Sequence, residues 1–365
     1  MRQLYLAATG QNRGKTTASL GLMDGFMRRG LRTGFLKPVG QRTVIMDGHP
    51  ADEDAVLVRT VFGLPEPYPQ MSPVHIPRGF TKAYIDGRVV EDLGAKIRVA
   101  HAAYRDHDVL LIEGTGHAGV GAVIGLSNAV VAAMLGAPAI IVSEGGVGRP
   151  IDEIVLNASL FTAHGVPVAG AIVNKVDLDA QPGIERVLER GLAKHGIALL
   201  GVLPVRPILS NPTLGMILEG VHGETIHPGP DLDRVIDDVA IGAMEPFHML
   251  SHVGPGTLVI VPGDRDDVIT TLTDAHADEL DRRSVGLVLT GGYRPPIEVL
   301  DQIRRVDLFA TLVAEDTYSV ASEIHDLLVK THAADREKID LIKSVVAENL
   351  SIDRVLGVAG TAPTS

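Results

Sequence analysis

Lys15 and Thr16 close a glycine-bounded loop, a position in which both residue types bind nucleotide phosphates. The loop follows a short apolar run that begins at Tyr5, and an apolar-periodic segment follows it. Backbone N–H groups at a helix N-terminus bind anions because the donors and the helix dipole both point towards the ligand. A lysine in this loop contacts the β- and γ-phosphates, and the hydroxyl after it holds Mg²⁺. The residues that we expect to bind the nucleotide are Gly10, Gln11, Asn12, Arg13, Gly14, Lys15, Thr16 and Thr17.

The spacing of this loop departs from the strict phosphate-loop pattern. Three residues separate Gly10 from Gly14, where the pattern has four, and Thr9 stands in place of the first glycine. The alternative is an ordinary glycine-rich turn that caps a helix. The context favours the phosphate loop, because Gly-Lys-Thr directly after a first strand rarely serves packing alone.

Further charged side chains lie near predicted strand ends or helix starts. Glu113 directly follows an apolar run and, with Thr16, would hold Mg²⁺, which prefers oxygen ligands and few protein carboxylates. Asp52 or Asp54 would supply another metal ligand, or would serve only as negative charge at a helix N-terminus. Lys37 either keeps its ammonium in water at the sheet edge or supplies a second cation for a transferred phosphoryl group.

Residues 114–119 offer a competing hypothesis, because they match the dinucleotide fingerprint G-x-G-x-x-G. Glu144 lies 25 residues after Gly119, roughly where a ribose-binding acid falls in that fold. Against it, Glu113 directly precedes the loop and would face a pyrophosphate unfavourably. The 14 histidines show no metal-ligand spacing, and only His117 falls in a candidate site.

Strand-like and helix-like segments alternate along the chain, and the strands are continuous apolar runs. Such strands are buried on both faces, so the sheet is mostly parallel and its ligands bind beyond the carboxyl ends of the strands. Lys37, Glu113, Ser143 and Asn174 all fall at predicted strand ends. The expected strands of this first part cover residues 33–36, 108–113, 139–142, 168–173 and 199–203, and the expected helices cover 52–62, 91–105, 126–135 and 151–164.

A second part follows Pro204, Pro207 and Pro212. The segments 263–267 and 290–292 follow its strands, where they either line a small-ligand site or provide only turn chemistry. The expected fold class is α/β: a P-loop parallel sheet with helices on both faces, plus a second, smaller α/β domain. Other expectations are a Pro-rich surface loop at 65–80, a helix at 335–349, frayed residues at 357–365, and domains 1–208 and 209–350 with a tail at 351–365.

Composition narrows the class of protein. The chain has 365 residues and a net charge of −12, which disfavours nucleic-acid and anionic-membrane partners. No apolar run reaches the length of a membrane span, and the first residues lead into a strand rather than a signal peptide. The absence of cysteine excludes disulfides, thiolate metal sites and cysteine nucleophiles. We expect a cytoplasmic protein.

Five segments resemble the dethiobiotin synthetase-like P-loop ATPases, in the form found at the N-terminus of long bacterial phosphotransacetylases. These segments are 9–17, 35–41, 52–57, 111–116 and 171–177. Residues from about 213 to 330 resemble the DRTGG domain that follows there, through 263–265 and 289–292. The resemblance implies a nucleotide-binding parallel sheet, often dimeric, with ATP and Mg²⁺ on the loop. By position it implies phosphate and metal contacts for Lys15, Thr16, Lys37, Asp54 and Glu113, and a base contact for Asn174.

The chain also departs from this family. Asn12 and Arg13 stand where the synthetase loop carries an acid and a small apolar residue, and 116–121 does not reproduce its substrate segment. Biotin synthesis is therefore not expected. The phosphotransacetylase catalytic domain is missing, so acetyl transfer to coenzyme A is not expected either. The cysteine glutaminase of cobyrinic acid diamide synthetases is excluded by the lack of cysteine.

The predicted function is that of an ATP- and Mg²⁺-dependent ligase-type enzyme, which activates a small carboxylate or carbamate by phosphoryl transfer. Lys15 and Lys37 are its candidate catalytic residues. Its partners would be a small-molecule substrate and a second copy in a dimer. The alternative is a nucleotide-sensing regulatory protein, whose second domain binds a metabolite or mediates oligomerisation and which shows little turnover.

Overall fold

A computed structural model describes residues 1–277, 284–327, 331–333 and 335–361 of the chain. The chain forms two compact units. The first consists of Met1–Val205 together with Thr331–Ser365, and the second consists of Arg206–Lys330. The second unit is thus inserted between two parts of the first. No helix in the described part is both long and apolar enough to cross a membrane.

The sheet of the first unit is parallel, apart from one short strand. Its order is β10-β9-β8-β1-β7-β2, and every one of these neighbours runs parallel. The short strand β16 (Gly360–Thr361) pairs antiparallel with the start of β1. The parallel strands are β1 (Arg2–Ala8), β2 (Thr33–Leu36), β7 (Val109–Glu113), β8 (Ala139–Glu144), β9 (Val168–Val176) and β10 (Leu199–Pro204).

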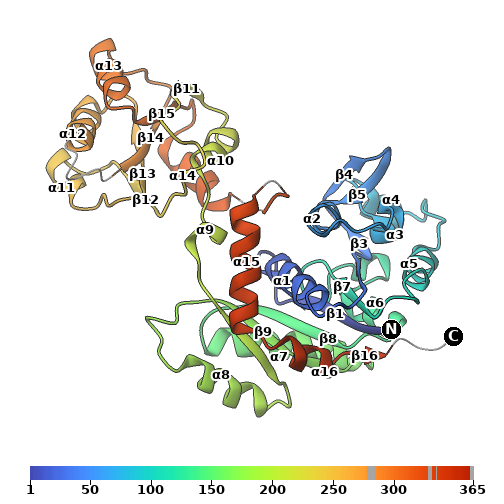
Figure 1. Cartoon of the computed structure of the whole chain (residues 1–365). Helices are drawn as coiled ribbons and strands as arrows, with labels where there is room; N and C mark the ends of the chain where they lie inside the picture. Colours follow the sequence, from blue (N-terminus) through green and yellow to red (C-terminus); the bar gives the residue numbers. More distant parts are fainter. Residues whose placement is uncertain (278–283, 328–330, 334, 362–365) are drawn as a thin grey trace. The chain divides into compact units, whose positions relative to one another are not determined.

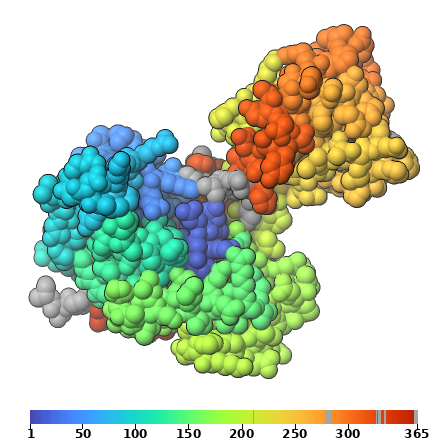
Figure 2. Space-filling view, turned by 180° about the vertical axis from the view of Figure 1, so that it is seen from behind, coloured from blue at the N-terminus to red at the C-terminus, as the bar shows by residue number. Residues whose placement is uncertain are grey.

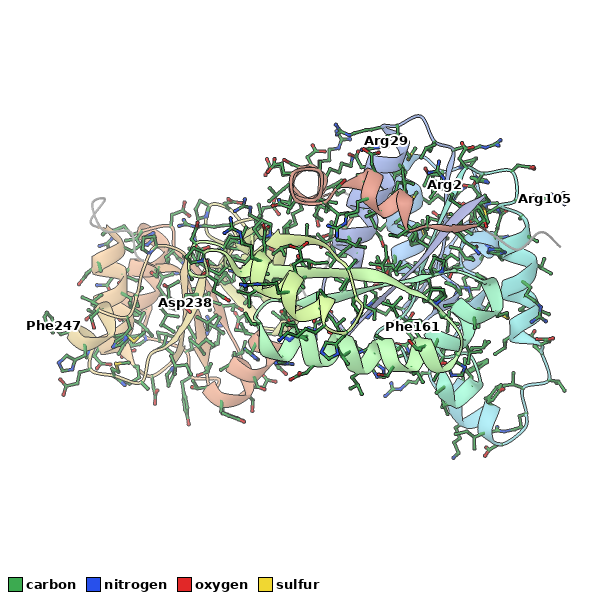
Figure 3. All side chains as sticks on the ribbon, turned by 90° about the horizontal axis from the view of Figure 1, so that it is seen from below. Arg2, Arg29, Arg105, Phe161, Asp238 and Phe247 are labelled. Atoms are coloured by element: carbon green, nitrogen blue, oxygen red, sulfur yellow. The ribbon has the colours of Figure 1, made fainter. Side chains whose placement is uncertain are left out.

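Helices cover both faces of this sheet, as the burial of its strands requires. The helices on one face share an apolar core with the sheet, and they form much of the surface seen in Figure 2. Phe161 lies fully buried in this core (Figure 3). These helices are α5 (Leu93–Ala102), α6 (Asn128–Leu135), α7 (Gly148–Ala163) and α8 (Ile184–Ala193).

The opposite face carries α1 (Lys15–Met27), which packs against two helices from the C-terminal part of the chain (Figure 1). A methyl group added at Gly21 or Gly25 would overlap Val346 of α15 (Arg336–Asn349) or Ile352 of α16 (Ile352–Gly357). The two glycines therefore permit the close approach of these helices.

This packing differs from the predicted domain boundaries. We expected residues up to 350 in the second domain and a tail at 351–365, but α15, α16 and β16 all belong to the first unit. The periodicity of a helix shows that one face is apolar, and it does not show which sheet covers that face. Residues 357–361 are also not frayed throughout, because β16 pairs with β1, and residues 362–365 lie outside the described part.

Smaller elements lie between β2 and α5 and around the site. The Pro-rich segment 65–80 was expected to be a surface loop, yet it contains a short helix and a strand, and Tyr68, Met71 and Val74 are buried. Isolated apolar residues among prolines gave no periodic signal. The elements are β3 (Val39–Gly40), β4 (Thr43–Met46), β5 (His49–Asp52), α2 (Glu53–Phe62), α3 (Tyr68–Met71), β6 (Val74–His75), α4 (Phe80–Ile85) and the 3₁₀ turn η1 (Ala122–Ile124).

The second unit is a smaller α/β layer structure. Its sheet has the order β11-β15-β14-β13-β12, in which only β11, at one edge, is antiparallel. The sequence did not predict β11 or β12, because both are short edge strands with exposed residues. The strands are β11 (Glu224–His227), β12 (Asp238–Ile241), β13 (Thr257–Pro262), β14 (Ser284–Thr290) and β15 (Phe309–Leu312).

Two apolar cores lie on the two faces of this second sheet. The α11–α13 helices cover one face, and α10 and α14 cover the other. Phe247 of α11 remains 81% exposed and points away from the unit in Figure 3. The helices are α9 (Pro207–Ser210), α10 (Leu214–Gly220), α11 (Pro246–Leu250), α12 (Asp266–Ala277), α13 (Ile297–Arg305) and α14 (Thr317–Asp326). The predicted α/β class with two domains is confirmed.

Candidate nucleotide site

The loop between β1 and α1 ends at Gly14, which caps the helix in the left-handed conformation with φ 94°. A methyl group at Gly14 would overlap the side-chain amide of Asn174, at the end of β9. That amide donates from Nδ2 to the carbonyl oxygen of Arg13 at 3.3 Å. Asn174 therefore holds the loop through its backbone. Its predicted contact with a nucleotide base stays a prediction.

Lys15 begins α1 at the carboxyl edge of the sheet. Burial, and then the charge of Lys37, lowers the pKa of Lys15 from 10.5 to about 8. Within the described residues, no hydrogen bond or ion pair engages its ammonium group. The amine therefore lacks a protein partner at the point where the sequence predicted a phosphate contact.

Lys37 lies just beyond β2, and its ammonium is buried between carboxylates. Its Nζ donates to Asp54 Oδ2 at 2.6 Å, to Glu113 Oε1 at 2.8 Å and to the Gly114 carbonyl at 3.5 Å. The residue is only 3% exposed, so the alternative of an ammonium in water at the sheet edge is wrong. Burial favours the neutral amine, but Asp54 and Glu113 outweigh it and raise the pKa of Lys37. The three ammonium hydrogens of Lys37 are thus all engaged.

The two aspartates at the start of α2 have different roles. Asp52 caps the helix, because its carboxylate accepts from the backbone N–H of Asp54 at 3.1 Å. Asp54 instead faces the loop, where it accepts from Thr16 Oγ1 at 3.2 Å. Burial opposes its ionisation, but the Lys37 ammonium holds the pKa of Asp54 below its usual range. Asp54 is therefore the better candidate for a metal ligand.

Glu113 ends β7 and is completely buried. Its second oxygen, Oε2, accepts from Ser19 Oγ at 2.5 Å, so Lys37 and Ser19 together fix both oxygens. Burial raises the pKa of Glu113 from 4.5 to about 7. The sequence analysis missed Ser19. The available signal was a polar residue one turn after Lys15 on an otherwise apolar helix face.

Thr16, Asp54 and Glu113 offer a hydroxyl and two carboxylates as oxygen donors, a set that fits Mg²⁺. No group of three or more His, Cys, Asp or Glu residues suited to hold a metal occurs in residues 1–277, 284–327, 331–333 and 335–361. The donor set therefore suits a cation that takes its other ligands from phosphates and water, as Mg²⁺ does with nucleotides.

Ser143 and Glu144 end β8 beside the loop. Ser143 Oγ lies 3.2 Å from Thr9 Oγ1, so the strand ends that the sequence predicted to converge do so here. Glu144 pairs with Arg13 and, at 3.2 Å, with Lys175. Its expected role as a ribose-binding acid in a dinucleotide fold therefore lacks support.

The dinucleotide hypothesis for residues 114–119 does not fit the local structure. The segment leads into the 3₁₀ turn η1 rather than into a helix whose N-terminus could bind a pyrophosphate. Asn128 instead binds the carbonyls of Thr115 and His117 at 2.8 and 2.7 Å. His117 is exposed, and its Nδ1 accepts a local bond from the Gly119 N–H at 3.2 Å.

The glycine segments of the second unit provide turn chemistry. The N–H groups of Gly291 and Gly292 donate to the carbonyls of Glu315 and Val313 at 2.8 and 2.9 Å. Arg265 is bound to the carboxylate of Asp267 at 2.8 and 3.0 Å. These N–H and guanidinium groups are the ones that a ligand would need, and they are already bound within the protein. The contacts therefore favour turn chemistry over a small-ligand site.

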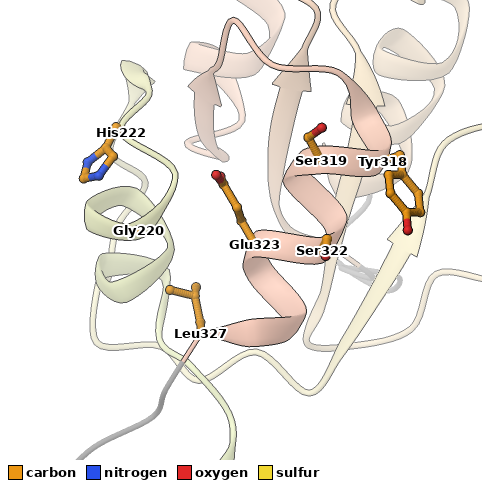
Figure 4. A pocket seen from close by; sticks show the side chains of 7 residues that line it. All are labelled: Gly220, His222, Tyr318, Ser319, Ser322, Glu323 and Leu327. Atoms are coloured by element: carbon orange, nitrogen blue, oxygen red, sulfur yellow. The ribbon is translucent and has the colours of Figure 1, made fainter. Parts of the chain in front are cut away.

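A cavity of about 640 Å³ opens between α10 and α14 in the second unit (Figure 4). Glu323 points from α14 to the side of Gly220 and His222, whereas Tyr318, which is 82% exposed, lies on the opposite side of α14 in Figure 4. The side chains of His222, Ser322 and Glu323 in the lining of this cavity are exposed. Its lining residues are Gly220, His222, Tyr318, Ser319, Ser322, Glu323 and Leu327.

A parallel sheet whose first strand leads through a glycine loop into a helix that begins with Lys-Thr defines a P-loop nucleotide-binding fold. Residues 2–213 match the family described as the AAA domain, and the chain belongs to this family. Residues 216–327 match the DRTGG domain. The predicted order, a dethiobiotin synthetase-like P-loop domain followed by a DRTGG domain, is confirmed.

Curated relatives carry the name phosphate acetyltransferase. The one from Pseudomonas putida is 30% identical over 368 residues, which cover 96% of this chain and 51% of the relative. The one from Pseudomonas aeruginosa is 28% identical over 386 residues, with 99% and 52% covered. The chain thus spans about half the length of the curated relatives that it matches.

Solved structures give distant similarities to this chain. The MinD cell division protein of Aquifex aeolicus aligns with a TM-score of 0.34 and 12% identity, over 57% of this chain and 84% of MinD. The CBS and DRTGG domains of Clostridium perfringens pyrophosphatase align with a TM-score of 0.28 and 15% identity, over 48% of this chain and 86% of that chain.

Proposed function

We propose that the first unit binds Mg·ATP and transfers its γ-phosphoryl group to a small carboxylate or carbamate, which an amine or similar nucleophile then attacks. One observation carries this proposal. The half-buried Lys15 ammonium, which has no partner among the described residues, lies at the start of α1, within the electrostatic reach of Lys37, Asp54 and Glu113. The acceptor class rests on the resemblance to dethiobiotin synthetase-like enzymes, as does a homodimer.

Each residue has a role in this proposal. The loop N–H groups and Lys15 would hold the phosphates, and Asn174 would contact the base as well as the loop. Thr16, Asp54 and Glu113 would hold Mg²⁺, whose charge would stabilise the transferring phosphoryl group. Lys37 would add a second positive charge. Because its three hydrogens are engaged in the ligand-free chain, a direct phosphate contact requires the exchange of one of these bonds.

The test is ADP production by the purified protein with Mg·ATP, bicarbonate and a panel of small carboxylates and amines. We expect substrate-stimulated ADP that disappears in Lys15→Ala. The matched control is Lys96→Ala, which removes a lysine that is 46% exposed and paired with Glu91. Equal ADP from the wild type and Lys15→Ala would contradict the proposal, because the loop lysine would then have no part in the reaction.

A second candidate function is that of a nucleotide-sensing regulatory protein. It is favoured by the full engagement of Lys37 and by the turn chemistry of the second unit, where a catalytic cluster was not found among the described residues. Tight ATP binding by calorimetry, with no ADP formed across the panel, would favour it over the enzyme. Acetyl transfer, which the names of the relatives imply for proteins of about twice this length, is not part of either proposal.

A further inference from the structure

Arg13 occupies an unusual place in the phosphate loop. Its side chain folds back over the loop itself, because a methyl group added at Gly10 would lie 3.3 Å from Arg13 Nε. The side chain is 20% exposed, although a guanidinium group is readily solvated by water. Its Nε–H is buried and has no hydrogen-bond partner among the described residues. An arginine that leaves a buried N–H unsatisfied is held in place by its other contacts.

The contacts that hold the Arg13 side chain come from β8 and α7. Arg13 Nη1 pairs with Glu144 Oε2 at the end of β8, and Nη2 lies 3.9 Å from Glu153 Oε1 on α7. Lys175 at the end of β9 pairs with the other Glu144 oxygen at 3.2 Å. The guanidinium group is thus part of an alternating network of charges that spans β8, β9 and α7.

The backbone of Arg13 is fixed from the same direction. Asn174 donates to its carbonyl oxygen at 3.3 Å, and the next residue, Lys175, has a φ of 55°. That conformation is rare outside glycine and persists only where the surroundings hold it. The end of β9 therefore holds Arg13 in two ways. Asn174 binds its backbone directly, and Lys175 pairs with Glu144, which in turn pairs with the Arg13 side chain.

We propose that Arg13 is the positioning residue of the phosphate loop, and that its ion pair with Glu144 holds the loop N–H groups in the conformation that binds phosphate. The spacing of this loop differs from the strict pattern, and the guanidinium group supplies a tie between the loop and the strand ends. The affinity test of this inference rests on the proposed nucleotide binding. The second test, amide hydrogen exchange of the loop without nucleotide, does not.

The affinity test is calorimetry of Mg·ATP binding to the full chain and to four variants: Arg13→Ala, Arg13→Lys, Glu144→Gln and the double variant Arg13→Ala with Glu144→Gln. We expect Arg13→Ala to weaken binding by about tenfold, the size of one strong coupled interaction. The double variant should bind no worse than Arg13→Ala, because the second change removes a contact that is already lost. Arg13→Lys should restore part of the affinity, since it keeps the charge.

The matched control is Arg29→Ala, just beyond the C-terminal end of α1. Arg29 also pairs with a carboxylate, that of Asp353, and is 37% exposed. The Arg29→Ala change should leave the affinity for Mg·ATP unchanged. A purely structural ion pair would lower the melting temperature of Arg13→Ala without changing ATP affinity, and that result would overturn the proposal. Losses in the two single variants that simply add in the double variant would also overturn it.

Amide hydrogen exchange of residues 10–14 in the ligand-free chain separates this inference from the proposed function. Arg13→Ala should accelerate exchange there and leave α5 and α8 unchanged. If the wild type does not bind Mg·ATP, the proposed function fails, while faster exchange in the variant still supports the positioning role. Unchanged exchange would overturn that role, whether or not ATP binds.

Discussion

The two units contain mostly parallel sheets covered by helices, but they differ in the charged side chains that they bury. In the described part of the first unit, the buried Lys, Asp and Glu residues are Lys37, Asp52, Glu66, Glu113 and Lys338. In the described part of the second unit, the buried polar side chains are hydroxyls and one imidazole, namely Thr257, Thr273, His276, Ser284, Thr290 and Thr311. Burial of charge is unfavourable unless partners compensate it. Lys37, Asp52 and Glu113 gather where the sheet ends, as in many functional sites.

The loops after the strands differ in the same way. In the second unit, the N–H groups of Gly263, Gly291 and Gly292 donate to backbone carbonyls, so the turns are complete without a ligand. In the first unit, Gly14 begins α1, and its neighbour Lys15 has no partner in the described part of the chain. A shared architecture therefore supports a ligand site in one unit and a closed set of turns in the other.

The largest expected effect is on the buried charges of the first unit. Lys37→Ala leaves the carboxylates of Asp54 and Glu113 without their shared cation, and we expect a loss of about 3–5 kcal/mol in the free energy of unfolding. Urea denaturation followed by hydrogen exchange should locate the loss in the first unit alone. The control is Lys175→Ala, which removes a half-buried lysine. A decrease of less than about 1 kcal/mol in the free energy of unfolding of Lys37→Ala would contradict this account.

A pair of glycines sharpens the comparison further. Gly263→Ala places a methyl group against the carbonyl of Tyr293, and we expect the second unit to lose about 1–3 kcal/mol of stability with ATP binding unchanged. Gly14→Ala meets both the Asn174 amide and a φ of 94°, at a cost of about 1–2 kcal/mol from the conformation alone. Only Gly14→Ala should abolish ATP binding in calorimetry. Equal effects of both changes on ATP binding would break the distinction between the two units.

The smallest effect is expected at Arg265, the arginine of the second unit that also follows a strand. The Arg265 side chain is 31% exposed and that of its partner Asp267 is 52% exposed. Arg265→Ala should therefore change the free energy of unfolding by only about 0–1 kcal/mol. Thermal unfolding and ATP calorimetry together measure this. A tenfold loss of ATP affinity would show that the second unit contributes to the nucleotide site after all.

Local sequence signals predicted most of the regular elements. The apolar run 33–36 is β2, and the segment 52–62, with acids at its start, is α2 (Glu53–Phe62) with Asp52 as its cap. The strand ends predicted that Lys37 and Glu113 lie close together, because parallel strands end at one edge of a sheet. These signals depend on residues that are close in sequence, or on a general rule of topology.

Contacts between distant residues were decided only by the tertiary structure. The placement of α15 on α1 depends on the fit of Val346 against Gly21, which no local pattern encodes. The partners of Lys37 and Arg13 likewise lie on other strands and helices, and burial then sets whether each charge is paired or solvated. The sequence by itself thus determined the class of fold and the residues that form the loop at the start of α1. The tertiary structure decided which helices complete the first unit and how its charges are paired, because both depend on packing across the chain.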